Sequence, residues 1–170
     1  VYVYEYLKTG PRAQYISDIN FINSREEGYA ILKRDEFNIK TDSFVSKSAN
    51  INYKNILSYN ENSSIDIMRW SPNRIVIETN VIGDNNKQHF MLLSEIYFPY
   101  GWKLEGNDDG KIVEVNNLLR GFFVSGGRSE IVLSFEPNDI KYGGMITYAS
   151  FILIIFMIFI PYIKSFYERV

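Results

Sequence analysis

The chain of 170 residues contains no cysteine and only one histidine, His89. The lack of cysteine excludes disulfides, thiolate metal sites and a cysteine nucleophile, and one histidine leaves a zinc site without its usual ligands. A single histidine beside a turn is more often a surface or structural residue than a catalytic base. We therefore expect no metal and no cofactor.

The sequence also lacks a dominant charge and a basic tract. Lys and Arg total 18, Asp and Glu total 20, and the formal net charge is -2. Proteins whose main partner is nucleic acid concentrate positive charge on one surface, so we expect no nucleic-acid partner. The Gly-x-Ser-x-Gly motif of serine hydrolases is absent as well.

The N-terminus has neither an initiator methionine nor the basic and apolar regions of a signal peptide, because the chain starts Val1-Tyr2-Val3-Tyr4. Two explanations are open. Either a signal has been removed, or the chain is the C-terminal part of a longer protein, which is the explanation that we favour.

One long apolar segment lies near the C-terminus. No charged side chain occurs from Tyr142 to Ile163, and Lys141 and Lys164 flank this segment. It holds about 22 residues, and a helix needs about 20 to cross the ~30 Å hydrocarbon layer. Core helices of small soluble domains are rarely apolar on every face over such a length. We predict a transmembrane helix over residues 141–163, which bends or ends near Pro161.

The orientation of this helix follows from its flanks. Lys164 and Arg169 come after the span and Lys141 comes before it, and positive residues favour the cytoplasmic side. A domain of ordinary size precedes the span, whereas only residues 164–170 follow it. We expect a protein of the cell membrane, with residues 1–140 extracytoplasmic and residues 164–170 as a cytoplasmic tail.

The first half of the domain combines strand patterns with one helix signal. Alternation predicts strands over residues 1–7 and 12–16 and around Phe44-Val45. Ser24-Arg25-Glu26-Glu27 fits a capping box, with Ser24 as the N-cap and Glu27 three residues later. It predicts a short helix over residues 25–33, although Gly28 lowers its helix propensity.

The second half of the domain indicates hairpins. Residues 65–70 and 74–81 flank the turn Ser71-Pro72-Asn73, and residues 102–105 and 111–115 flank Asn107-Asp108-Asp109-Gly110. Further strands are predicted over residues 90–94, 121–124 and 131–135, with a turn at residues 83–86. Short strands with frequent turns are typical of a β-sandwich. The predicted fold class is mainly β: a β-sandwich over residues 1–140 with one short helix, followed by a single C-terminal transmembrane helix.

Residues 94–137 carry the most specific pattern in the chain. The pattern comprises Ser94-Glu95-Ile96-Tyr97-Phe98-Pro99-Tyr100-Gly101-Trp102, the turn Asp109-Gly110-Lys111, the stretch from Asn117 to Arg120, and Gly126-Gly127 before the last strand. In order and spacing this region resembles the C-terminal part of the YfhO family of bacterial membrane proteins. The chain departs from the family at Tyr100, which is inserted, and at Ser125 and Ser129, which replace the usual Pro and His.

The resemblance implies that the whole protein is a polytopic glycosyltransferase of the C type (GT-C) that acts on cell-envelope polymers with polyprenyl-phosphate sugars outside the cytoplasm. Family members hold their acidic catalytic residues in a loop between early membrane helices, so the resemblance implies no catalytic residue here. It implies as partners the lipid bilayer, the upstream transmembrane domain, and a polyprenyl-phosphate sugar or cell-wall glycopolymer. The alternative is a tail-anchored surface module that binds glycans without enzymatic activity. A self-contained enzyme is disfavoured, because no set of nucleophile, base and orienting residue is recognisable.

Four residues are candidate contacts for a glycan or an acceptor. The aromatic side chains of Tyr97, Tyr100 and Trp102 match the C–H faces of sugar rings, and the forked guanidinium of Arg120 suits a phosphate. The alternative for Trp102 is a place in the sandwich core. The alternative for Arg120 is an ion pair with a nearby acid such as Glu95 or Glu114.

Two adjacent carboxylates, Asp108 and Asp109, also allow two interpretations. They suit acid–base chemistry or a cation site, but they stand beside Gly110 in a turn, where Asp is favoured for backbone reasons. We favour the turn.

Overall fold

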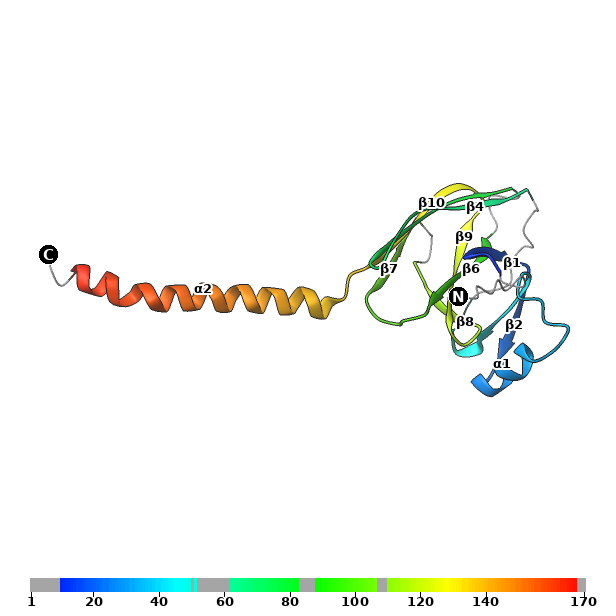
Figure 1. Ribbon diagram of the computed structural model, residues 1–170, viewed down its shortest axis with the longest axis horizontal. Coiled ribbons are helices and arrows are strands. Elements are labelled where there is room, and N and C mark those ends of the chain that lie inside the picture. The colour runs from blue at the N-terminus through cyan, green and yellow to red at the C-terminus, as the bar shows by residue number, and fades with distance from the viewer. Residues whose placement is uncertain (1–9, 50, 52–61, 83–87, 107–109, 168–170) are drawn as a thin grey trace, which may run out of the picture. The chain divides into compact units, whose positions relative to one another are not determined.

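The computed structural model describes residues 10–49, 51, 62–82, 88–106 and 110–167. The chain forms two compact units, Val1–Phe135 and Glu136–Val170. The first contains two β-sheets and a short helix, and the second is a single apolar helix (Figure 1). The predicted fold class is thereby confirmed. The strand predicted over residues 1–7, the turn at residues 83–86 and the pair Asp108-Asp109 lie outside the described residues.

The larger sheet has six strands in the order β1-β6-β9-β8-β3-β2. These strands are β1 (Ala13–Ile16), β2 (Asp18–Ile22), β3 (Asp42–Ser46), β6 (Gln88–Ile96), β8 (Val113–Val115) and β9 (Leu119–Ser125). Neighbours are antiparallel except β2 and β3, which are parallel. Helix α1 (Arg25–Leu32) connects these two strands, as parallel neighbours require a crossover, and the 3₁₀ helix η1 (Lys47–Ala49) follows β3.

The smaller sheet has four strands in the order β4-β5-β10-β7, all antiparallel. Its strands are β4 (Ser64–Ser71), β5 (Arg74–Val81), β7 (Trp102–Glu105) and β10 (Gly127–Phe135). The hairpin predicted around residues 71–73 is confirmed, with Ser71 opposite Arg74. The pairing shifts between Ile67 and Arg69, which marks a bulge at the intervening residue.

A hydrophobic core fills the space between the two sheets. Its buried members are Tyr15, Ile75, Ile77, Val81, Met91, Leu93, Leu104, Phe122, Val124, Ile131 and Leu133. The opposite face of the larger sheet carries a second cluster, which includes Phe90, Val115 and Phe123, and Ala49 and Ile51 pack against it. The sheet is therefore buried on both faces, which explains the nearly continuous apolar runs of β6 and β9.

Helix α1 begins as its capping signal predicts. Ser24 is the N-cap and its side-chain oxygen accepts a hydrogen bond from the backbone N–H of Glu27. The carboxylate of Glu27 accepts a hydrogen bond from the backbone N–H of Asn23, at 2.8 Å, one residue before the position usual for a capping box. The helix covers Ile22 and Phe44 with Ile31 and so adds a third small cluster.

The second hairpin prediction is wrong. β7 pairs with β10 in the smaller sheet, whereas β8 pairs with β9 and β3 in the larger sheet. The chain between them changes sheets instead of turning back on its own strand. The apolar side chains explain the difference, because Leu104 packs in the core between the sheets, whereas Val113 and Val115 pack on the opposite face of the larger sheet.

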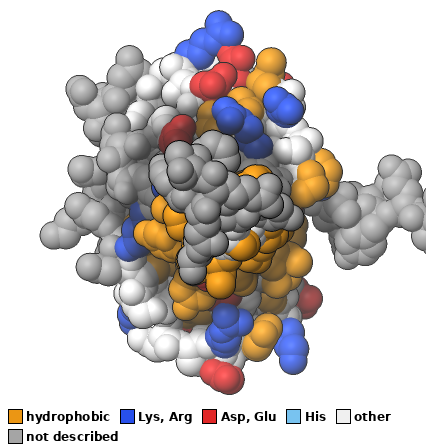
Figure 2. Space-filling view, turned by 90° about the vertical axis from the view of Figure 1, so that its left-hand side faces the viewer, with side chains coloured by type: hydrophobic (Ala, Val, Ile, Leu, Met, Phe, Trp, Pro, Cys, Tyr) orange, Lys and Arg blue, Asp and Glu red, His pale blue; other side chains and the backbone are white. Residues whose placement is uncertain are grey.

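The second unit is helix α2 (Asn138–Tyr167). Residues Asn138–Pro161 are 24 residues with a mean hydropathy of 2.3 and no burial within the protein, which makes this helix long and apolar enough to cross a membrane. Figure 2 shows exposed hydrophobic side chains on the face of the molecule that is turned to the viewer. The helix continues through Pro161, so of the two predicted alternatives, a bend or an end near this residue, the end is wrong.

Candidate functional site

The segment that joins β6 to β7 places its aromatic residues in a row. The rings of Phe98 and Tyr100 are 5.9 Å apart, and Phe98 lies 6.4 Å from Phe135 at the end of β10. Phe135 in turn lies 5.3 Å from Trp102. Tyr100 is 72% exposed, whereas Trp102 is half-buried at the margin of the core. Trp102 therefore packs as part of the sandwich, whereas Tyr100 is largely exposed and contacts Phe98.

Arg120 is buried beneath this row. Alternation along β9 places it on the same face as Phe122 and Val124, which face the smaller sheet. Its guanidinium carbon lies 3.9 Å from the ring centroid of Trp102, and its Nε donates a hydrogen bond to the carbonyl of Ile96 at 2.9 Å. Burial lowers the pKa of Arg120, and the charge of Glu95 partly offsets this effect.

The ion pair considered for Arg120 is not formed. The carboxylate of Glu95 lies 3.4 Å from Nε of Arg12 and accepts a hydrogen bond from the indole N–H of Trp70. The carboxylate of Glu114 pairs with Arg25 at 2.7 Å. Arg120 is held instead by the backbone carbonyl of Ile96 and the aromatic face of Trp102.

Tyr97 is a partly buried neighbour of this cluster. Its backbone N–H donates to the carbonyl of Leu118 at 2.7 Å. Burial raises the pKa of its phenol, and the charges of Glu114 and Tyr100 raise it further. The structure thus brings Trp102 and Arg120 into contact and places Tyr100 outside that contact. A glycan or acceptor role for these four residues stays a prediction.

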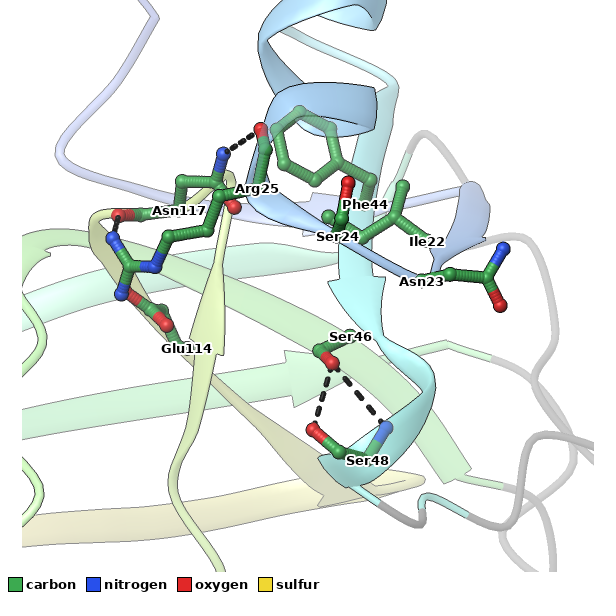
Figure 3. Close-up of a pocket in the computed structure, with 9 residues that line it drawn as sticks. All are labelled: Ile22, Asn23, Ser24, Arg25, Phe44, Ser46, Ser48, Glu114 and Asn117. Atoms are coloured by element: carbon green, nitrogen blue, oxygen red, sulfur yellow. Dashed lines mark hydrogen bonds and ion pairs between the residues drawn. The ribbon is translucent and has the colours of Figure 1, made fainter.

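A second candidate site was missed by sequence reasoning. It is a pocket of about 250 Å³ between the N-terminus of α1 and strand β3 (Figure 3). Its lining comes from separate segments of the chain: Ile22, Asn23, Ser24, Arg25, Phe44, Ser46, Ser48, Glu114 and Asn117. Several of these residues carried sequence signals, such as helix capping at Ser24, a strand at Phe44 and a possible ion pair at Glu114, but none of those signals indicated a pocket. The remaining residues meet through long-range pairing, which no local motif reveals.

One side of the pocket is built around Arg25. Its guanidinium pairs with Glu114, and its own backbone carbonyl accepts a hydrogen bond from the side-chain amide of Asn117 at 2.9 Å. Figure 3 shows Ser46 and Ser48 below this group, with their hydroxyl oxygens 2.7 Å apart. The polar groups therefore belong to short networks that fix their positions.

Two neighbouring asparagines set the shape of the pocket. Asn116 and Asn117 have φ of 53° and 60°, the left-handed region that Asn tolerates better than most residues. Asn116 is buried, and its side-chain oxygen accepts a hydrogen bond from the backbone N–H of Phe44 at 2.9 Å. The backbone N–H of Asn116 donates a hydrogen bond to the carbonyl of Phe44 at 3.0 Å. This turn completes the pairing of β3 beyond the end of β8.

Gly28 lets α1 approach the sheet. A Cβ atom at this position would lie 2.5 Å from a ring carbon of Phe44 and 2.7 Å from the amide nitrogen of Asn117. Real Cβ atoms do not come so close to other atoms. Gly28 lowers the intrinsic stability of the helix, but it allows the close packing that forms one wall of the pocket.

The pocket chemistry suits binding better than proton transfer. Amide, hydroxyl and ion-paired groups surround an apolar floor of Ile22 and Phe44, which is the combination that fits a small ligand rich in hydroxyl groups. Its one carboxylate, Glu114, is already engaged by Arg25. Within the described ranges, no three His, Asp or Glu side chains come together as a metal site would require. His89 is buried beside Tyr15, with 6.5 Å between the ring centroids.

Comparisons of the chain with protein-family models, curated proteins and solved structures found no match. The resemblance to the YfhO family is consequently a hypothesis that rests on residues 94–137.

Proposed function

We propose that the chain is a non-catalytic, membrane-anchored β-sandwich that forms the C-terminal part of a YfhO-like membrane protein. In this proposal the whole protein is a glycosyltransferase that transfers sugar from a polyprenyl-phosphate donor to a cell-envelope polymer. The observation that supports the anchoring is the 24-residue apolar segment of α2, none of which is buried within the protein. An isolated apolar helix of this length is stable in lipid, where its backbone groups are all paired internally.

The two units suit an accessory role. A folded body of two sheets is joined to the apolar helix by Glu136 and Pro137, the residues between β10 and α2. Such a body adds a recognition surface at the membrane to machinery located elsewhere in the protein. The test is to express the whole protein with and without residues 1–135, retaining α2 in both forms. Sugar transfer that proceeds at the same rate without the sandwich would remove this role.

The proposal places the sandwich outside the cytoplasm. The support is the flanking charge, with Lys164 and Arg169 after the span and Lys141 before it. A variant Ile82→Cys provides a single thiol at an exposed position of the sandwich, because the chain has no other cysteine. We expect a membrane-impermeant maleimide to label this variant in intact cells. Labelling only after the cells are broken would reverse the orientation.

A second candidate function is glycan binding without any enzyme. The specific observation in its favour is the pocket at α1, whose volume and mixed polar and apolar lining fit one sugar residue of a polymer. Binding of envelope glycans to the detergent-solubilised chain would support it, provided that Arg25→Ala weakens binding. Arg128→Ala is the matched control, because Arg128 also pairs with a glutamate, Glu78, but at a distance from the pocket.

These two candidates differ in one result. An accessory domain of a glycosyltransferase affects sugar transfer by the whole protein, whereas a binding module retains its affinity when no transmembrane domain precedes it. Loss of transfer in Arg25→Ala, together with negligible glycan affinity of the isolated chain, favours the first candidate. Strong affinity of the isolated chain favours the second.

A further inference from the structure

One end of the sandwich is rich in exposed apolar side chains. This is the end at which β10 finishes, and we call it the Phe135 end. Strand register places Trp102 opposite Phe135, and Phe135 donates its backbone N–H to Asn73 in the turn between β4 and β5. From the other sheet, Arg120 reaches Trp102. The segments that meet here are residues 69–74, 94–102, 118–120 and 135.

The exposed apolar residues of this end are large. Tyr100 is 72% exposed, Ile96 66%, Leu118 53% and Phe98 50%. Phe98 and Tyr100 stand on the same connection, on either side of Pro99. Soluble surfaces carry single exposed apolar residues, but a group of large ones marks a contact with a partner or a membrane.

The same end carries an excess of positive charge. Arg69, Arg74 and Lys103 are exposed. Two carboxylates lie among these groups: Glu95, which is paired with Arg12, and Glu136, which is exposed next to Phe135. Aromatic residues surrounded by Lys and Arg are the composition that proteins place at the level of anionic lipid headgroups.

The chain length brings this end to the membrane. The span Asn138–Pro161 has 24 residues and so measures about 36 Å as a helix, more than the ~30 Å hydrocarbon layer. Its first residues therefore lie among the headgroups. Phe135 precedes Asn138 by three residues, which extend at most about 11 Å, so the backbone at Phe135 stays within that distance of the headgroup layer.

We propose that the Phe135 end docks on the bilayer surface, with Phe98 and Tyr100 among the headgroups and Arg69, Arg74 and Lys103 against anionic lipid. The inference rests on the proposed membrane anchoring by α2 and adds a second membrane contact to it. This contact limits the tilting of the sandwich on its short connection to α2. The pocket at α1, whose lining residue Asn117 immediately precedes Leu118, is then held close to the membrane surface.

The test uses the absence of cysteine. Tyr100→Cys and Leu118→Cys each provide one thiol at the Phe135 end, and both side chains are exposed enough to carry a fluorescent nitrobenzoxadiazole label. Ile82→Cys is the matched control, because Ile82 is an exposed apolar residue that follows β5 at the opposite end. Each labelled chain is reconstituted in vesicles of phosphatidylcholine and phosphatidylglycerol, with and without lipids that carry a nitroxide quencher on the headgroup.

We expect the quencher to reduce emission from the labels at Tyr100→Cys and Leu118→Cys by roughly twofold, and emission from Ile82→Cys hardly at all. Equal quenching at all three positions would overturn the proposal. Blue-shifted emission without quenching would overturn it as well, because a protein surface, either the upstream domain or a second copy, would then cover this end.

Extraction of the same vesicles with alkaline carbonate distinguishes a failure of the anchoring by α2 from a failure of the docking of the Phe135 end. A chain that is released by carbonate is not anchored by α2, so the proposed anchoring fails. A chain that is retained, but whose labels at the Phe135 end are not quenched, is anchored without docking, and only the present inference fails.

Discussion

The guanidinium of Arg120 lies over the indole ring of Trp102, with its central carbon 3.9 Å from the ring centroid. The two residues come from different sheets, so this contact joins the sheets at the margin of their common core. A desolvated cation over an aromatic face contributes about 2 kcal/mol. The residues that suggested a ligand site thus also serve the packing of the sandwich.

Removal of the indole should therefore lower stability. We expect Trp102→Ala to reduce the free energy of unfolding by about 3 kcal/mol, because it leaves a cavity and an uncovered Arg120. Tyr100→Ala, which removes an aromatic ring that is 72% exposed, should change it by less than about 0.5 kcal/mol. Chemical denaturation of the detergent-solubilised chain, followed by circular dichroism, measures both. Equal effects would mean that Trp102 is not part of the packing.

The second prediction concerns Gly28, where α1 approaches the sheet closely. Gly→Ala in a helix normally stabilises it by about 1 kcal/mol. Gly28→Ala should instead destabilise the sandwich by about 1–3 kcal/mol, because the added methyl meets the ring of Phe44 at 2.5 Å. Gly143→Ala, in α2, is the control, because apart from the adjoining helix backbone no atom lies within 4 Å of the new methyl. The melting temperature of the sandwich should fall in the first variant and stay unchanged in the second.

The parts of the fold that local patterns specify were predictable. The β4–β5 hairpin follows from alternation on both sides of Ser71-Pro72-Asn73, and the start of α1 follows from Ser24 and Glu27. In each case the residues that carry the signal touch one another. The physical causes, a turn conformation and a capped helix end, act over a few residues and so are visible in the sequence.

The parts that depend on distant contacts were not predictable. The turn residues 107–110 indicate only that the chain bends, whereas the partners of β7 and β8 are chosen by the two faces of the larger sheet. The pocket at α1 joins Arg25 to Glu114, which are 89 positions apart. Neither the residue types nor their spacing in the sequence indicate this contact, because it depends on the spatial order of the six strands in the larger sheet.

The turn at Asn116 yields a third prediction. Asn116→Ala removes the acceptor for the backbone N–H of Phe44 and puts a Cβ-bearing residue without a polar side chain at φ 53°. We expect a loss of about 2–3 kcal/mol from the free energy of unfolding. Asn116→Gly tolerates the backbone conformation and loses only the hydrogen bond, so its loss should be smaller by about 1 kcal/mol.

Comparison of these two variants isolates the two causes. If Asn116→Ala and Asn116→Gly lose the same free energy, the positive φ costs nothing at this position and the hydrogen bond accounts for the whole effect. If neither variant is destabilised, the carboxamide of Asn116 has no structural role, and the wall of the pocket must be held by other contacts. Denaturation by urea, read by circular dichroism, gives both values.

The last prediction concerns the pH dependence of α1. The hydrogen bond from the backbone N–H of Asn23 holds the pKa of Glu27 below its ordinary value of 4.5, and a backbone hydrogen bond together with one from the Ser24 side chain lowers the pKa of Glu26. A carboxyl group whose pKa is lower in the folded state stabilises that state at pH values above 4.5, and the effect is lost as the pH falls through the lowered pKa.

Protection of the α1 amides against hydrogen exchange should therefore decrease as the pH falls below about 4.5, while β5 stays protected. In the double variant Glu26→Gln and Glu27→Gln this decrease should disappear, because no titrating carboxyl remains at the helix N-terminus. Mass spectrometry of exchanged peptides, corrected for the intrinsic pH dependence of exchange, measures the protection. A decrease of the same size in the double variant would show that other groups govern the acid sensitivity of α1.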